Sequence, residues 1–139
     1  MDQAEFQRLV EEWNPRTALG ALGIRVDRFD PLQFQISLEI DERHLQHMGM
    51  LHGGISALLA ETAASLAAAM TVDLHNWTVV GVDLNVTHLR PVTGGRVTAT
   101  ARPLYQGRTT QVYELSLTNS EEQQFCAGRC TVAVRPRRR

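Results

Sequence analysis

The apolar residues near the N-terminus follow a helical period. They recur at i, i+3, i+4 and i+7, which predicts an amphipathic helix over residues 2–13. The four positions are Phe6, Leu9, Val10 and Trp13. An Asn-Pro pair follows and should end the helix, because the residue before a proline disfavours the helical conformation. Residues 1–17 are therefore expected to form an N-terminal helical segment.

From residue 32 onward the period changes to two, which is typical of strands with one buried face. It occurs first over residues 32–40 and then, after a long apolar segment, in four further segments separated by turn residues. The residues expected to share one face in these four are Val80, Val82, Leu84 and Val86; Val97, Ala99 and Ala101; Gln111, Tyr113, Leu115 and Leu117; and Cys126, Gly128, Cys130, Val132 and Val134. One strand, one helix and several antiparallel strands indicate an α+β domain.

The long apolar segment is predicted to form a helix over residues 54–72. Residues 53–72 contain a single ionisable side chain, Glu61, and no continuous polar face. A helix that is apolar on nearly all sides must be enclosed, and a curved antiparallel sheet would enclose it. Such a sheet leaves edges, so a dimer that pairs them is expected.

Composition and net charge exclude some classes of partner and function. The 139 residues suit a single domain, 1–139, and the net charge of −1 favours neither nucleic acid nor a membrane as partner. The basic tail, residues 135–139, is expected to be solvated, with contact to a phosphorylated ligand as the alternative. Neither a secretory signal nor a paired-cysteine motif is visible, so we expect a cytoplasmic protein with reduced Cys126 and Cys130.

Glu61 and the start of its helix are the features of this sequence that could take part in a chemical reaction. A lone carboxylate in an apolar helix is costly to bury, and burial would raise its pKa toward that of a general base. The helix opens with His52-Gly53-Gly54. The N–H of Gly53 or of Gly54 could donate to a carbonyl oxygen as it gains negative charge.

Spacing restricts how these two features can cooperate. Gly53 and Glu61 are about 12 Å apart along a helix, so they cannot touch one substrate carbonyl within one chain. A two-fold dimer would bring the glutamate of one chain to the glycine of the other. Ser65 follows Glu61 by one turn and could hold the carboxylate or a water molecule.

The histidines outside this motif have weaker signals. His88 shares a strand face with Val86, where a histidine is more often structural than catalytic. His44 and His47 have a spacing that a metal site could use, but no third ligand accompanies them, so no metal is expected.

The combined motifs resemble a known family. The residues that carry the resemblance are Gln46-x-x-Gly49-x-x-His52-Gly53-Gly54, Ala60-Glu61-Thr62 with Ser65, residues 80–91 with Asn85-x-Thr87-His88-x-Arg90-Pro91, and Pro103-Leu104-x-x-Gly107-Arg108. Over residues 18–134 the chain is similar to the hotdog-fold acyl-CoA thioesterases of the PaaI-like, 4-hydroxybenzoyl-CoA thioesterase type. The branch with the enterobactin proofreading and dihydroxynaphthoyl-CoA thioesterases is most similar. His47-Met48 departs from the Pro-Phe of those relatives.

The resemblance implies a role for each matching residue. Glu61 would be the nucleophile or general base, and the Gly53 N–H would polarise the thioester carbonyl. Gln46 and His52 would lie beside the thioester, and Ser65 would orient water. The substrate-binding candidates are His88, Gly54, Arg90 and Arg108, with the two arginines as possible contacts to CoA phosphates.

The implied activity is hydrolysis of an aromatic or medium-chain acyl-CoA, or of a carrier-protein thioester. No cofactor is expected, because CoA is part of the substrate. The family also implies dimers with shared sites that pair into tetramers. The alternatives are a hotdog-fold enoyl-CoA hydratase or dehydratase, and a non-catalytic acyl-CoA binding module.

Overall fold

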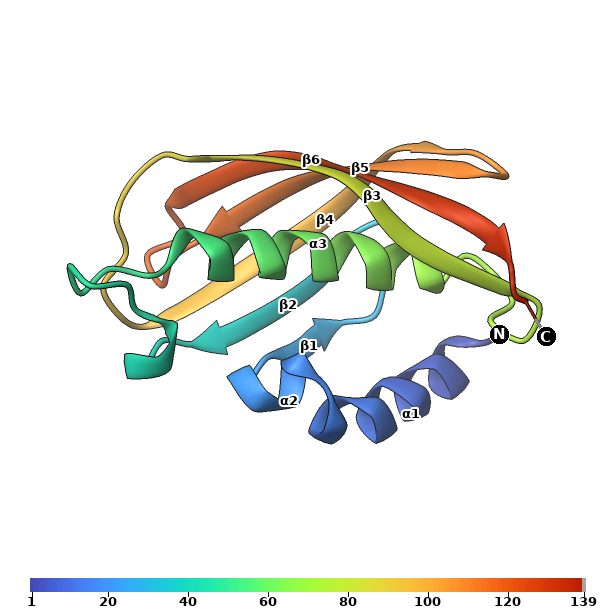
Figure 1. Ribbon diagram of the computed structural model, residues 1–139, viewed down its shortest axis with the longest axis horizontal. Helices are drawn as coiled ribbons and strands as arrows, with labels where there is room; N and C mark the ends of the chain where they lie inside the picture. Colours follow the sequence, from blue (N-terminus) through green and yellow to red (C-terminus); the bar gives the residue numbers. More distant parts are fainter. Residues whose placement is uncertain (139) are drawn as a thin grey trace.

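A curved antiparallel sheet and one long helix form the centre of the computed structural model, which describes residues 1–138 (Figure 1). The six strands are ordered β1-β2-β4-β5-β6-β3. They are β1 (Arg25–Arg28), β2 (Phe34–Glu39), β3 (Trp77–His88), β4 (Arg96–Gln106), β5 (Thr110–Thr118) and β6 (Gln124–Pro136). The helices are α1 (Gln3–Trp13), α2 (Ala18–Leu22) and α3 (Gly53–Ala69), with 3₁₀ turns at Asn14–Arg16 and Glu42–His44. The predicted α+β architecture is confirmed.

The central helix α3 lies in the concavity of the sheet and contacts strands β2 to β6. Its buried face is built mostly from alanines, whose small side chains let the helix approach the strands closely. The opposite face, which includes Leu58, Glu61 and Leu66, is only partly covered or exposed. The prediction that a curved antiparallel sheet wraps one central helix is confirmed, and in the single chain the sheet wraps the helix from one side.

Strand β3 forms one edge of the sheet and, within residues 1–138, pairs only with β6. Its register shifts between Gly81, which faces Val132, and Asp83, which faces Thr131, so that Val82 is an extra residue. Val80 and Val82 are 49% and 59% exposed, so the four apolar residues predicted to share one face of this strand do not. The bulge interrupts the alternation on which that prediction rested.

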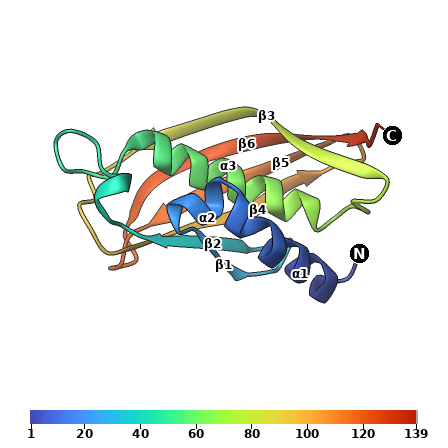
Figure 2. The ribbon, with the colours of Figure 1, turned by 60° about the horizontal axis from the view of Figure 1, so that its bottom comes forward.

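The N-terminal segment packs beside β1 and β2 at the edge opposite β3 (Figure 2). Asp2 caps α1 by accepting a hydrogen bond from the Glu5 N–H at 2.8 Å. Phe6 of α1 packs edge-to-face on Phe29, which packs in turn on Phe34 of β2. These contacts between aromatic rings join the helix to the core of the sheet.

The basic C-terminal residues are ordered through most of their length. β6 continues to Pro136, and the Arg137 N–H donates to the Asn76 carbonyl oxygen at 2.8 Å. The Arg135 and Arg137 guanidinium groups donate to the carbonyl oxygens of Thr109 and Leu74. These residues are exposed, as expected of a solvated tail, but the expectation of a frayed tail is wrong for Arg135 and Arg137, because backbone hydrogen bonds hold them. Arg139 lies outside the described residues.

Both cysteines are free and buried in β6, as the sequence predicted. Burial raises the pKa of the Cys130 thiol to about 11, with the Glu61 and Asp83 carboxylates adding to the effect. Only about one Cys130 thiol in a thousand is then ionised at pH 8. No helix within residues 1–138 is both long and apolar enough to cross a membrane.

Burial raises the pKa of the Cys126 thiol as well, so we expect both thiols to be unreactive. We expect a chromogenic disulfide reagent at pH 8 to modify the native protein at least about tenfold more slowly than the denatured protein, which should show two thiols. Absorbance of the released thiolate measures both rates. Equal rates in the two states would contradict the burial that the structure shows.

Candidate active site

The segment that leads into α3 is a compact loop held by its own backbone. The Gln46 N–H donates to the Met50 carbonyl oxygen and the His52 N–H to that of His44, each at 2.8 Å. Gly49 has a φ of 77°, which a residue with a side chain adopts only with strain. Met48 lies at the tip and is 79% exposed. The loop therefore presents Gln46 on one side of the helix start.

His44 is a structural residue of this loop. It is fully buried, its Nδ1 accepts from the Asp41 N–H at 2.9 Å, and its Nε2 lies 2.8 Å from the Leu22 carbonyl oxygen, to which it donates. Both ring nitrogens are thus occupied by the backbone. This use of the ring explains His44 without a metal ion.

The His52 side chain caps α3 and occupies one of the first two backbone N–H groups of the helix. Its Nδ1 accepts from the Gly54 N–H at 2.8 Å. The Gly53 N–H has no acceptor within residues 1–138 and points from the positive end of the 17-residue helix. Of the two donors that the sequence left open, the structure leaves the Gly53 N–H available.

Four predicted residues meet in one cavity of about 420 Å³ at this end of α3: Gln46, Gly53, His88 and Arg90. A Cβ placed on Gly53 would lie 2.9 Å from Nε2 of His88, so the imidazole lies directly against the glycine. The Gln46 Oε1 accepts from the Met48 N–H, which leaves its NH₂ group as a free donor. The cavity therefore offers hydrogen-bond donors around the Gly53 backbone.

Glu61 and Ser65 lie in a different groove of about 560 Å³ on the open face of α3, together with Gly54. Leu58 and Leu84 give this groove apolar walls. Glu61 is exposed in the single chain and takes part in none of the ion pairs of residues 1–138. The expectation of a buried Glu61 is wrong for the single chain, because β3 is the strand that reaches this side of the helix and it leaves the carboxylate exposed.

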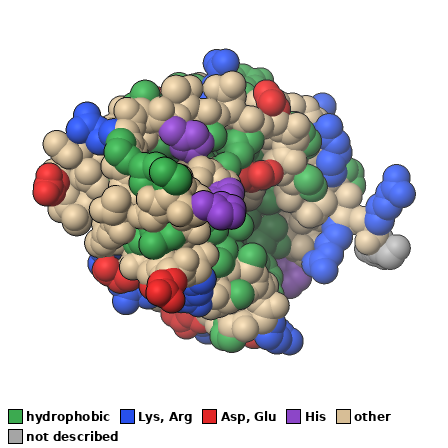
Figure 3. Space-filling view, turned by 60° about the vertical axis from the view of Figure 1, so that its left-hand side comes forward, with side chains coloured by type: hydrophobic (Ala, Val, Ile, Leu, Met, Phe, Trp, Pro, Cys, Tyr) green, Lys and Arg blue, Asp and Glu red, His purple; other side chains and the backbone are tan. Residues whose placement is uncertain are grey.

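The surface at the start of α3 shows how these groups are exposed. Histidine side chains border an apolar area there, and a carboxylate side chain lies close by (Figure 3). A concave apolar surface with a few polar groups is typical of a small-molecule site.

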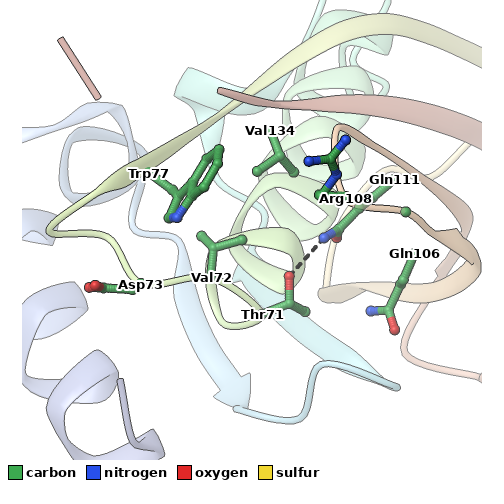
Figure 4. Close-up of a pocket in the computed structure, with 9 residues that line it drawn as sticks. Thr71, Val72, Asp73, Trp77, Gln106, Arg108, Gln111 and Val134 are labelled. Carbon is green, nitrogen blue, oxygen red and sulfur yellow. Dashed lines mark hydrogen bonds between the residues drawn. The ribbon is translucent and has the colours of Figure 1, made fainter. Parts of the chain in front are cut away.

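Arg108 lies apart from the other predicted residues. It belongs to the turn between β4 and β5, in a third cavity of about 430 Å³ near the C-terminal end of α3. Gln111 in that cavity is nearly buried and donates to the Thr71 hydroxyl at 2.8 Å (Figure 4). Within one chain the two candidate arginines, Arg90 and Arg108, therefore serve different cavities.

The sequence did not single out the apolar walls, Leu58 and Leu84, nor Ser56 in the cavity of Gly53. Leu58 precedes Glu61 by three positions and so shares its helix face, which is the signal that could have identified it. Leu84 faces the helix only because of the bulge at Val82, and no sequence pattern predicts that bulge.

Comparison with known proteins agrees with this fold. The model of the Thioesterase superfamily matches residues 48–126. The 1,4-dihydroxy-2-naphthoyl-CoA hydrolase of Listeria monocytogenes is 38% identical over 118 residues, which cover 85% of this chain and 95% of that protein. The proofreading thioesterase EntH of Klebsiella pneumoniae is 37% identical over 118 residues, 85% of either chain.

A solved structure shows the same arrangement. The crystal structure of a mutant thioesterase from Pseudomonas aeruginosa superposes with a TM-score of 0.87 at 35% identity, covering 99% of this chain and 96% of that one. The chain belongs to the Thioesterase superfamily, has the hotdog fold, and is a thioester hydrolase.

Proposed function

We propose that this protein hydrolyses an aromatic or medium-chain acyl-CoA to the free acid and CoA. The observation that carries the proposal is the Gly53 N–H beside His88 and Gln46, together with the Glu61 carboxylate on the same helix. Within residues 1–138 this N–H has no acceptor and this carboxylate forms no ion pair. Together these supply an oxyanion donor and a base, the two groups that acyl transfer from a thioester needs.

The Gly53 N–H polarises the thioester carbonyl, helped by the dipole of α3. Glu61 then acts in one of two ways. As a base it takes a proton from water while the water oxygen attacks the carbonyl carbon; as a nucleophile it attacks directly and forms an anhydride that water cleaves. In either case the C–S bond breaks and the CoA sulfur leaves as a thiolate. The thiolate takes up the proton that the water molecule loses, which in the base mechanism passes through Glu61, so that the Glu61 carboxylate is restored. Ser65, on the same face as Glu61, orients the water.

We further propose that each site is shared between two chains. The two cavities have no residue in common, and Gly53 and Glu61 are about 12 Å apart along α3. The free edge of β3, with its exposed valines, and the open apolar face of α3 are adjacent surfaces that a second copy would cover. Such a dimer would bury Glu61 of one chain near Gly53 of the other. Association of dimers into tetramers is part of the same proposal.

Arg90 and Arg108 are proposed contacts to CoA phosphates. They lie at opposite ends of the 17-residue helix α3, which is about 25 Å long. They can therefore reach one CoA only from different chains, which agrees with an antiparallel pairing of the two helices. His52 and Gly54 support the site by holding the first turn of α3, and no cofactor enters the reaction.

Thiol release from a panel of acyl-CoAs tests the activity directly. We expect turnover with aromatic and medium-chain thioesters, measured by the absorbance of a thiol reagent, and no dependence on added cofactor. The relative from Listeria monocytogenes, a 1,4-dihydroxy-2-naphthoyl-CoA hydrolase, makes aromatic acyl groups the first to examine.

The same panel distinguishes the alternatives. Loss of the enoyl absorbance without thiol release would indicate a hydratase. Tight binding of acyl-CoA without turnover would indicate a binding module. Release from a carrier-protein thioester at a higher kcat/KM than from CoA would identify the carrier protein as the donor.

A further inference from the structure

A glycine on β3 lies directly against the Glu61 side chain. A Cβ placed on Gly81 would lie 3.0 Å from Cδ and 3.2 Å from Cγ of Glu61, and it would overlap with Oε1. Three successive atoms of the glutamate therefore occupy the space that any other residue at position 81 would fill. A glycine inside a strand weakens it, and such a glycine often marks a close approach of this kind.

The bulge in β3 is what directs Gly81 at the helix. Because Val82 is an extra residue, Gly81 and Leu84 both face α3, although three positions separate them. Leu84 forms the wall of the groove and Gly81 leaves a recess beside it. The exposed carboxylate of Glu61 lies in this recess, without an ion pair within residues 1–138.

We propose that Gly81 is a positioning residue, which sets the direction of the Glu61 carboxylate by leaving room for it against the β3 backbone. The proposal rests on the catalytic role of Glu61 proposed above. A flexible side chain held by no ion pair needs a shaped surface to restrict it, and catalytic groups must be held to within about 0.5 Å. A Cβ at position 81 would push the carboxylate out of the recess rather than displace the backbone, because the glutamate is the movable partner.

The variant Gly81→Ala tests this with little risk to the fold. The backbone at Gly81 lies outside the positive-φ region, so alanine is accommodated, and alanine restricts the unfolded chain more than glycine does. We expect an unchanged or higher melting temperature, a kcat lowered by about 10- to 100-fold, and a KM within about twofold of the wild type. Gly94→Ala is the matched control, because nothing lies within 4 Å of a Cβ there.

A double-mutant comparison assigns the effect to Glu61. If Gly81 acts through the carboxylate, Gly81→Ala should lower the residual activity of Glu61→Gln by less than about twofold. Equal losses in the two backgrounds would overturn the proposal, as would wild-type kcat in Gly81→Ala. Sedimentation should show the wild-type assembly for Gly81→Ala, and a change in assembly would likewise overturn it.

The outcomes separate this proposal from the proposed function. Full activity in Glu61→Gln would remove the catalytic role itself, whatever Gly81→Ala does. A large loss in Glu61→Gln with none in Gly81→Ala would leave the function intact and remove only the positioning role.

Discussion

Replacing Glu61 with glutamine should lower kcat for acyl-CoA hydrolysis by about 10²- to 10⁴-fold, the usual contribution of a general base. Glutamine keeps the shape of the side chain but neither accepts a proton readily nor attacks a carbonyl. We expect KM to change little, because other residues, Gly53, His88 and Arg90, make the predicted substrate contacts. Steady-state thiol release measures both parameters.

The stability of this variant provides an internal control. Glu61 is exposed and takes part in none of the ion pairs of residues 1–138, so the free energy of unfolding should change by less than about 0.5 kcal/mol. Glu121→Gln, an exposed glutamate on the turn before β6, is the matched substitution and should keep full activity. Undiminished kcat in Glu61→Gln would refute the proposed mechanism.

Two inactive variants should restore activity when their chains are mixed. Gly53→Leu would fill the cavity beside His88, whereas Glu61→Gln removes the carboxylate and leaves that cavity intact. A mixed dimer has one site with both substitutions and one with neither. Random association of equal amounts makes half of the dimers mixed, so we expect about one quarter of the wild-type activity.

The mixing experiment requires unfolding and refolding the two chains together, with a different affinity tag on each. Purification through both tags isolates the mixed dimers, which should then have about half of the wild-type activity. Each variant refolded alone is the control and should stay inactive. Isolated mixed dimers that are inactive would show that each site is contained within one chain, contrary to the proposal.

Regular periodicity made most of the fold predictable. The spacing of Phe6 and Val10 predicted a helix, and the period of two predicted the strands β4, β5 and β6. Each pattern indicates which side chains contact the core, and the structure confirms these elements. β1 was not predicted, because its four residues are mostly exposed and carry no alternating pattern. The face of β3 was wrong at Val80 and Val82, because a bulge shifts the register without a local sequence signal.

The candidate site was predictable in its members but not in its arrangement. Gln46, Gly53, His88 and Arg90 were singled out separately, and the structure brings them into one cavity. Arg108 was grouped with them, yet it lies at the far end of α3, because the turn between β4 and β5 returns there. Which cavity a residue lines depends on strand order, which residue types alone do not specify.

The Glu61 carboxylate in the apolar helix shows most clearly what the sequence determines and what only the tertiary structure decides. The sequence by itself determined that Glu61 is the single ionisable residue in residues 53–72 and that it follows Gly53 by eight positions. Helix geometry converts that spacing into a distance of about 12 Å. Only the tertiary structure decided that Glu61 faces an open groove rather than the core, that His52 occupies the Gly54 N–H, and that Gly81 makes room for the carboxylate. The open groove and the contact with Gly81 bring together segments distant in the chain, and their geometry arises only when the sheet packs against the helix.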